Sequence, residues 1–280
     1  MPPMKLNPRY DGLPIIELDG PSEAILPPVI RQRQRFAATL ATFDDEQWAH
    51  PSRCAGWSAR DVIVHLDSTN TFWNFAVGAG LGGAPSQFLA DFDPVSSPAA
   101  LVAASDVGAA ELLGQFARST DQLADTLSRL DHDGWLTRAE SPVGHVTVST
   151  VMHHALWDSW IHERDVLLPM GITPPEEADE ITATLRYVGA LGLAYAVHTG
   201  SSKRGALGVT ATDPDVAFVV TMGDQAVVHT GRGDADVELV GDAVGLIEAL
   251  SVRAPLAVDL PDEHRWMLEG LTTIFESTDA

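Results

Sequence analysis

Basic residues and cysteine are scarce in this sequence. Its 280 residues contain 17 Lys and Arg against 39 Asp and Glu, which gives a formal net charge of −22 at pH 7. A surface this acidic repels phosphate backbones and anionic lipid, so we expect no nucleic-acid partner and no membrane partner. Cys54 is the single cysteine, so no disulfide can form within the chain, as is typical of proteins in a reducing cytosol.

Long apolar runs and targeting signals are also missing. No stretch offers the roughly 20 consecutive apolar residues that a membrane-spanning helix needs. The opening MPPMKLNPRYDGLPIIELDG (1–20) lacks the apolar middle and cleavage site of a signal peptide. We therefore expect a soluble, cytoplasmic protein. The phosphate-binding loop, the dinucleotide fingerprint and the G-x-S-x-G elbow are absent as well, so nucleotide-dependent and serine-hydrolase chemistry is not indicated.

Helical periodicity dominates the first part of the chain. Residues 1–28 are rich in Pro and Gly and lack periodicity, which predicts an N-terminal arm. Beyond them, four long helices are predicted at about residues 29–43, 59–77, 99–130 and 148–168. Ser58, followed three residues later by Asp61, is typical of the start of the second helix. Residues 78–98 form a long predicted loop. Four helices with apolar stripes favour an antiparallel four-helix bundle over residues 29–175.

A different pattern follows Pro174 and Pro175. One more helix, at about 176–197, precedes four short runs with strand character, each bounded by Gly or Asp turns. These runs are ALGVTATD, DVAFVVTMG, AVVHTG and ADVELVG. A helix at 242–252, an extended run near 256–260 and a closing helix at 262–275 complete the pattern. Clustered strands with flanking helices indicate a smaller second domain over residues 176–280, and the fold class is therefore α+β.

The fourth predicted helix carries possible metal ligands. In MHHALWDSWIHERD (152–165), His154, Asp158 and His162 are each four residues apart and so share one helix face. His65, on the second helix, is the candidate ligand from a neighbouring helix, since bundle sites are built from inward-facing side chains of several helices. Such a set leaves coordination positions open, which is typical of catalytic sites.

Ordinary interpretations of these residues remain open. A helical histidine among apolar residues is commonly a core residue bonded to a carbonyl, and Asp with His four residues later is a common helical pair. However, Asp158 lies between Trp157 and Trp160, and burying a carboxylate is costly without a cation. The combination favours a metal site. Cys54, in the turn before the second helix, is predicted to be structural.

Three segments carry a family resemblance. DDEQWAHPSRCAGWSARDVIVHL (44–66) contains a tryptophan, a Cys-x-Gly-Trp turn, Arg-Asp-Val and a histidine, and WIHERDVLL (160–168) contains a histidine followed by an aspartate. Both resemble the mycothiol-dependent maleylpyruvate isomerase family, a branch of the DinB-like metal-binding bundles. Residues 226–258 are similar to the sterol-carrier-like C-terminal domain of that family. The resemblance covers most of the chain from about residue 30 and implies a DinB-like bundle followed by a sterol-carrier-like domain.

The resemblance also implies a ligand set. The family's metal, usually zinc with nickel or iron as alternatives, would be held by His65, Asp158 and His162. Members commonly have glutamate or histidine where this chain has Asp158, so the metal could shift or His154 could share ligation. We assign His154 a second-sphere or proton-handling role. Arg253 matches a functionally important arginine of the isomerase-type members, although their preceding glycine is Val252 here.

The implied chemistry uses a thiol. Coordination to a divalent metal deprotonates a thiol, and the family's thiol cosubstrate is mycothiol. The primary hypothesis is a metal-dependent mycothiol S-transferase that presents a metal-bound thiolate to an electrophilic small molecule. One alternative is a mycothiol-dependent cis-trans isomerase of a maleylpyruvate-like diacid. Another is a non-catalytic small-molecule binding protein whose metal site has degenerated.

Overall fold

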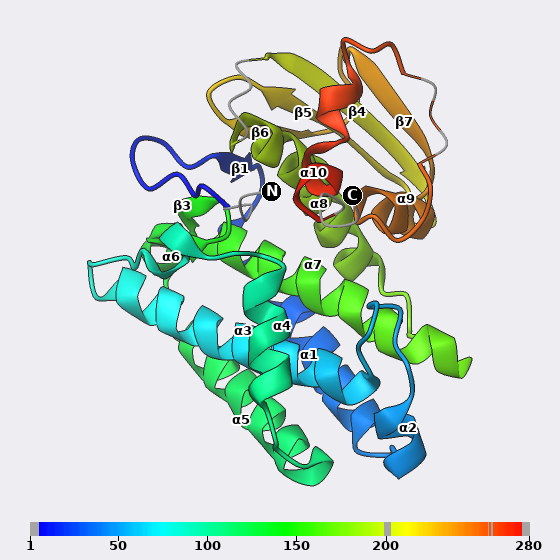
Figure 1. Cartoon of the computed structure of the whole chain (residues 1–280). Helices are drawn as coiled ribbons and strands as arrows, with labels where there is room; N and C mark the ends of the chain where they lie inside the picture. Colours follow the sequence, from blue (N-terminus) through cyan, green and yellow to red (C-terminus); the bar gives the residue numbers. More distant parts are fainter. Residues whose placement is uncertain (1–5, 199–202, 257, 259, 276–280) are drawn as a thin grey trace.

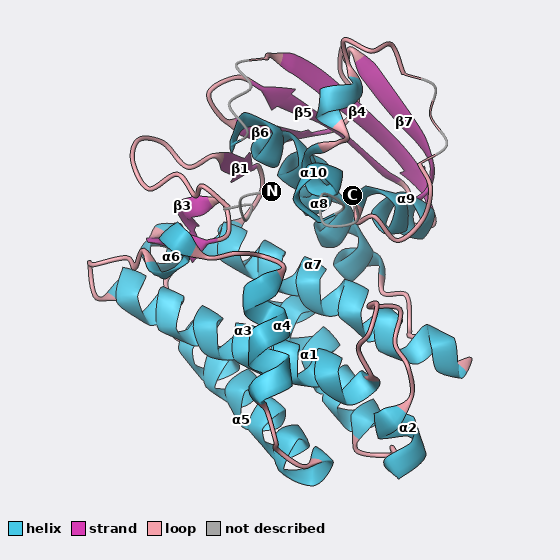
Figure 2. Ribbon diagram, in the orientation of Figure 1, coloured by secondary structure: helices cyan, strands magenta, loops and turns pink. Residues whose placement is uncertain are grey.

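The computed structural model describes residues 6–198, 203–256, 258 and 260–275. Long helices form one part of the molecule and a sheet forms the other, with α8 (Ala178–His198) running between them (Figure 1). Helices and strands are segregated, apart from a short hairpin at the edge of the bundle (Figure 2). The predicted α+β class is confirmed. Within the described residues, no helix is long and apolar enough to cross a bilayer.

Four long helices make up the bundle. They are α1 (Leu26–Leu40), α3 (Ala59–Leu81), α5 (Ala109–Leu127) and α7 (Val148–Leu167), with the shorter α2 (Asp45–Ala49), α4 (Ser96–Ala104) and α6 (His132–Leu136). The predicted start of α3 is confirmed, since the Ser58 side chain accepts from the Asp61 amide and the Asp61 side chain from the Ser58 amide. Because α3 extends to Leu81 and α4 begins at Ser96, the predicted loop at 78–98 is shorter than expected.

The predicted helix at 99–130 is wrong as a single element. It is broken between Ala104 and Ala109, where Ser, Asp and Gly favour turn conformations over helix. The break leaves backbone carbonyls free, and Arg60 donates to the carbonyls of Ser105 and Val107 at 2.9 and 2.8 Å. The two helices therefore take different directions, and α4 lies beside α3.

A hairpin that the sequence did not predict connects α6 to α7. Its strands are β2 (Arg138–Ser141) and β3 (Gly144–Thr147), which pair antiparallel. Gly80 of α3 lies so close that an added Cβ would be 2.3 Å from the Arg138 carbonyl oxygen. Only a glycine lets the helix and the hairpin approach this closely.

The second domain contains a five-stranded sheet of order β1-β6-β5-β4-β7. Its strands are β1 (Ile16–Leu18), β4 (Gly205–Thr212), β5 (Val216–Met222), β6 (Ala226–Thr230) and β7 (Val237–Asp242). All four predicted strand runs are confirmed. The edge strand β1 comes from the N-terminal arm and pairs parallel with β6, which the sequence did not predict.

Two helices pack against this sheet, and a third lies on one of them. α8 packs against β1, β5 and β6, α9 (Ala243–Leu250) packs against β4 and β7, and α10 (Gly270–Phe275) lies on α8. The closing helix predicted at 262–275 is wrong in its first half, where a 3-10 turn at Arg265–Met267 precedes α10. The extended run predicted near 256–260 falls partly on residues 257 and 259, which lie outside the described residues.

One hydrophobic core spans both parts of the molecule. It joins Trp160 of α7, Tyr187 and Leu191 of α8, and Val220 and Leu239 of the sheet, all at most 1% exposed. α7 is buried over almost its whole length because the bundle covers one side and α8 the other. The helix that carries the predicted ligands therefore lies at the junction of bundle and sheet.

We expect Gly80→Ala to lower the free energy of unfolding by about 1–3 kcal/mol, because the new methyl group would overpack against the hairpin backbone. Gly78→Ala is the matched control, since Gly78 is exposed on the same helix with nothing within 4 Å of its added Cβ. It should stabilise the protein by up to about 1 kcal/mol through helix propensity. Urea unfolding of both variants checks this, and equal stability would contradict the close approach.

Candidate metal centre and active-site cavity

Three predicted ligands meet between α3 and α7. The Asp158 Oδ1 atom lies 3.7 Å from His65 Nε2 and 3.6 Å from His162 Nε2. The three donor atoms all lie within 4.8 Å of one another. Donors around a tetrahedral zinc with bonds near 2.1 Å are about 3.4 Å apart, so the set fits a divalent metal with small adjustments. His154, one turn before Asp158, belongs to neither ligand group found among the described residues.

Asp158 is held as a carboxylate. Burial raises the pKa of its carboxyl, but the hydrogen bond and charge of His65, with the charges of His162 and His154, outweigh burial and hold it below the usual range. Arg33 adds positive charge from within the bundle. Arg33 is fully buried and donates to Asn70 Oδ1 and the Ala155 carbonyl. A buried anion between two imidazoles is the charge distribution that a divalent cation requires.

The ring of His162 is oriented by Asp165. Nδ1 of His162 lies 3.0 Å from Asp165 Oδ2, so Nε2 faces Asp158. Burial lowers the pKa of His162, but its hydrogen bonds to Asp165 and Cys54 and the charge of Asp158 prevail and raise it to about 10. A histidine ligand that gives its other nitrogen to a carboxylate is the usual arrangement in protein metal sites.

Asp165 itself is a completely buried hub. It accepts hydrogen bonds from Arg53 Nε at 2.9 Å and from Arg253 Nε and Nη2, both at 3.0 Å. Arg53 also donates to both carboxylate oxygens of Glu248 on α9, at 2.7 and 3.1 Å, and Arg164 donates to the same carboxylate. These ion pairs tie the bundle to the second domain directly behind His162.

A second possible ligand group shares His162. It combines Cys54, His162 and Asp165, and Cys54 Sγ lies 3.6 Å from His162 Nδ1 and 3.3 Å from Asp165 Oδ2. Two guanidinium groups already neutralise Asp165, so a cation at this position would be repelled by Arg53 and Arg253. The group of His65, Asp158 and His162 is the better candidate metal site because, within the described part of the chain, Asp158 pairs with two histidines and forms no ion pair with an arginine.

His154 lies deeper, among aromatic side chains. Its Nδ1 is 2.6 Å from the Tyr187 hydroxyl, and its ring contacts Trp73 and Trp157. Burial lowers its pKa to about 4, with Asp158 opposing, so the imidazole is neutral at neutral pH. The structure therefore places this predicted catalytic residue in the cavity wall, outside the donor group.

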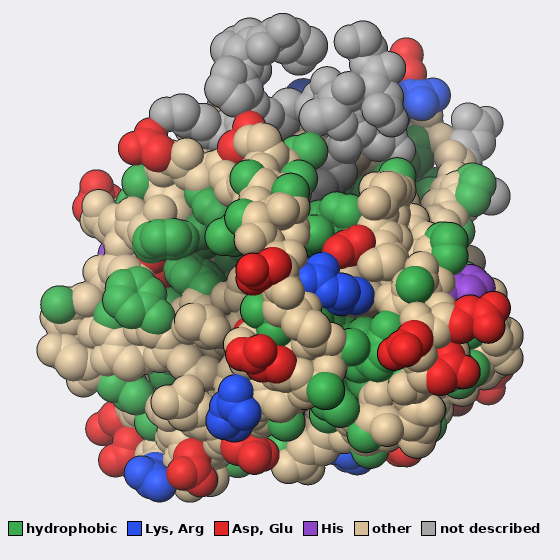
Figure 3. Space-filling view, turned by 60° about the horizontal axis from the view of Figure 1, so that its bottom comes forward, with side chains coloured by type: hydrophobic (Ala, Val, Ile, Leu, Met, Phe, Trp, Pro, Cys, Tyr) green, Lys and Arg blue, Asp and Glu red, His purple; other side chains and the backbone are tan. Residues whose placement is uncertain are grey.

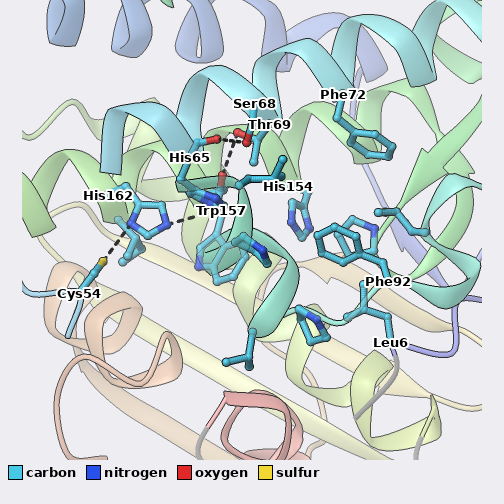
Figure 4. A pocket seen from close by; sticks show the side chains of 18 of the residues that line it. Leu6, Cys54, His65, Ser68, Thr69, Phe72, Phe92, His154, Trp157 and His162 are labelled. Atoms are coloured by element: carbon cyan, nitrogen blue, oxygen red, sulfur yellow. Dashed lines mark hydrogen bonds and ion pairs between the residues drawn. The ribbon is translucent and has the colours of Figure 1, made fainter. Parts of the chain in front are cut away.

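The donor group opens into a cavity of about 800 Å³. His65, His162 and Cys54 lie at one end of it, Trp157 and His154 lie in the middle, and Phe72, Phe92 and Leu6 lie at the other end (Figure 4). Arg53 and Arg253 line the same cavity beside the donor group. All five predicted site residues therefore face one space, and three of them form a possible metal centre.

Comparison with known proteins identifies the family of the helical bundle. The family model of the mycothiol maleylpyruvate isomerase N-terminal domain matches residues 29–167. Residues 29–167 belong to this domain family. A comparison with curated proteins finds no match.

Two solved structures share the fold. One is described as the crystal structure of the mycothiol-dependent maleylpyruvate isomerase, with 16% sequence identity, coverage of 87% of this chain and 96% of that chain, and a TM-score of 0.62. The other is a histidine-to-alanine mutant of that enzyme, with the same identity and coverage and a TM-score of 0.61. At this identity the likeness shows the fold alone.

Val252, which stands where the family pattern has a glycine, lies in a left-handed backbone conformation. Val252 has φ +59°, the left-handed conformation that a glycine adopts without strain. A β-branched residue there costs of order 1–3 kcal/mol. The following residue, Arg253, nevertheless reaches Asp165 with two nitrogen atoms. The chain accepts local strain and keeps this ion pair.

Arg53, Asp165 and Glu248 are site residues that sequence reasoning missed. Asp165 could have been found, because it follows His162 by three residues and so lies on the same helix face. Arg53 and Glu248 could not, since they are 195 residues apart and meet only through the docking of the two domains.

We expect Asp165→Asn to lower the free energy of unfolding by about 3–5 kcal/mol, because it removes the buried carboxylate that pairs with the partly buried side chains of Arg53 and Arg253. Burial raises the pKa of the Asp165 carboxyl, but hydrogen bonds and charges from His162 and Arg253 hold it far below the usual range. The folded pKa is thus below the unfolded value of about 3.9. The carboxylate's contribution is present above about pH 4 and is lost as the pH falls below it.

Urea titrations between about pH 7 and about pH 3 check this prediction. The wild type should lose stability below about pH 4 more steeply than the Asn variant. Asp125→Asn is the matched control, because Asp125 forms an exposed pair with Arg129 that contributes at most about 1 kcal/mol. An Asp165→Asn variant as stable as the control would show that the hub does not hold the fold together.

Proposed function

We propose that this chain is a mycothiol-dependent enzyme that uses a divalent metal, held by His65, Asp158 and His162, to transfer the thiol to an electrophilic small molecule. The observation that carries the proposal is the donor group itself, two imidazoles and one carboxylate at the end of a large cavity. The solved structures of similar fold, named as mycothiol-dependent enzymes, support the choice of thiol.

A bound divalent metal would supply a thiolate at neutral pH by lowering the pKa of the coordinated thiol. The chain's own residues prepare the site for that chemistry. Asp165 fixes the ring of His162 so that Nε2 points toward Asp158. Trp57 packs against the ring of His65, with ring centroids 5.5 Å apart, and would shield that side of a bound thiol from water. Two nitrogen donors and one oxygen donor suit zinc, with nickel or iron as alternatives.

His154 would handle a proton beside the reacting atoms. Its imidazole is neutral and Tyr187 holds its Nδ1 atom, so a proton exchanged with the thiol or the electrophile would be carried at Nε2. Nε2 can accept a proton in the tautomer whose Nδ1–H donates to the Tyr187 hydroxyl, and it can donate one in the other tautomer.

Isomerisation of a maleylpyruvate-like diacid is the second candidate. The observation that favours it is the presence of Arg253 in the cavity wall close to the donor group, where it would face a carboxylate of the substrate. Both reactions begin with attack by the thiolate on an electrophilic carbon. In the isomerase the thiol leaves again after rotation about the former double bond, and in the transferase the carbon–sulfur bond persists.

Elemental analysis of the purified protein tests the metal. We expect close to one equivalent of zinc, nickel or iron, and we expect His65→Ala and His162→Ala each to lose it, because two donors do not hold a divalent ion against water. His132→Ala is the matched control, since His132 is exposed on α6 far from the donor group in sequence and fold. A wild-type protein that stays metal-free after reconstitution would overturn the proposed metal site and favour a non-catalytic small-molecule binding protein.

Thiol consumption separates the two reactions. With mycothiol and an electrophile, we expect one thiol consumed for each electrophile and a conjugate detected by mass spectrometry. With maleylpyruvate, an isomerase would form the trans isomer while the thiol concentration stays constant. Turnover of maleylpyruvate with unchanged thiol would favour the isomerase. Absence of any reaction in the metal-loaded protein with either class would contradict the proposed function.

A further inference from the structure

The two ends of the cavity differ in chemistry. The donor group, Cys54 and the two arginines lie at one end, and aromatic and aliphatic side chains line the remainder (Figure 4). The apolar end is formed by segments from four parts of the chain. Leu6, Phe72 and Phe92 lie at this end (Figure 4), and the ring of Phe88 lies 5.9 Å from that of Phe72. Leu89 and Leu101 also line the cavity.

Several of these apolar side chains are exposed although they line a cavity. Phe88 is 64% exposed and Leu101 is 52% exposed, and Phe75 of α3, also in the lining, is 54% exposed. In the space-filling view, a group of hydrophobic side chains lies at the left of the face shown, and further hydrophobic and acidic side chains are scattered over the remainder (Figure 3). Exposed apolar side chains around a cavity are typical of a binding site for an apolar molecule.

The cations of the cavity are already neutralised. Among the lining residues that the structure describes, Arg53 and Arg253 are the only Lys or Arg side chains. Every side-chain nitrogen of Arg53 donates to a carboxylate, namely Asp165 or Glu248. Arg253 uses Nε and Nη2 for Asp165, and its Nη1 lies 3.4 Å from the Ser251 carbonyl.

This charge balance disfavours a dianion. Desolvating a carboxylate is costly unless a cation or several donors receive it. Arg53, Arg164 and Arg253 are balanced by Asp165, Glu248 and Glu176, since Arg164 pairs with both glutamates. A divalent metal would in turn be partly neutralised by Asp158. A substrate with two carboxylates would therefore have to compete with buried acidic side chains for each guanidinium.

We propose that the electrophile of this enzyme is a bulky aromatic or otherwise apolar molecule without a second carboxylate, and that its body lies against Phe72, Phe88 and Phe92. The chemical reaction in this statement rests on the proposed function, whereas the binding preference rests on the cavity wall alone. A cavity of about 800 Å³ has room for such a molecule beside the thiol end. Aromatic faces at its far end would hold an aromatic ring by stacking or edge contacts.

Fluorescence titration with N-phenyl-1-naphthylamine, an uncharged aromatic probe, tests the preference. We expect saturable binding to the wild type, and we expect maleate, a small dicarboxylate, to displace none of the probe. Phe88→Asp should weaken probe binding by roughly tenfold or more, because it replaces apolar contact with a charge. Phe88 is exposed, so this change should leave folding intact.

Leu136→Asp is the matched control. Leu136 is an exposed hydrophobic residue on α6, at 47%, and does not line the cavity. Its change should leave probe binding as in the wild type. Equal binding by Phe88→Asp and the wild type would overturn the proposal, and so would displacement of the probe by maleate.

The same titration on His65→Ala separates this inference from the proposed function. Because the apolar end contains no metal ligand, probe binding should persist in that variant within about twofold. If the wild type binds the probe but holds no metal and shows no thiol chemistry, the binding preference is supported and the proposed function is contradicted. Thiol chemistry restricted to dicarboxylates would overturn the preference and leave the enzyme standing.

Discussion

The buried carboxylate of Asp165 is the interaction on which the rest of the site depends. It is completely enclosed, so its charge can be tolerated only with cations beside it. Arg53 comes from the loop between α2 and α3, and Arg253 comes from the segment after α9. The Asp165 carboxylate therefore gains both of its arginine partners only when the α2–α3 loop, α7 and the second domain are assembled. The orientation of His162 by Asp165 therefore depends on the docking of the second domain against the bundle.

The same constraint explains where the cavity lies. α7 is enclosed by the bundle on one side and by α8 on the other, so polar groups on it must find partners within the protein. Glu163 pairs with Arg35, Asp165 pairs with Arg53 and Arg253, and Asp158 is left with two imidazoles. A carboxylate in such a helix without an arginine is the exception, and it faces the cavity. The proposed metal would complete its charge balance.

Much of this arrangement could be predicted from the sequence because it depends on local periodicity. The spacing of Asp158 and His162 placed them on one helix face, and the strand runs of the second domain were short, apolar and bounded by turns. Other features could not be predicted, since they depend on partners far along the chain. β1 has three residues and is a strand only because β6 accepts it. The pairing of Arg53 with Glu248 likewise requires the assembled core.

Arg253 links the orientation of the proposed metal ligand His162 to the charge that the cavity offers a substrate. The family resemblance assigns Arg253 a functional role although valine stands at 252 in place of the family's glycine, and Val252 adopts the left-handed conformation. Arg253 is limited as a substrate-binding residue by its partner, because its Nε and Nη2 atoms both donate to Asp165. The carboxylate that orients the proposed metal ligand His162 thus also neutralises a guanidinium group that lines the cavity. Asp165 orients the metal ligand His162, and it also occupies the arginine that could bind a negatively charged substrate. The proposed preference for apolar electrophiles therefore has the same structural origin as the geometry of the proposed metal centre.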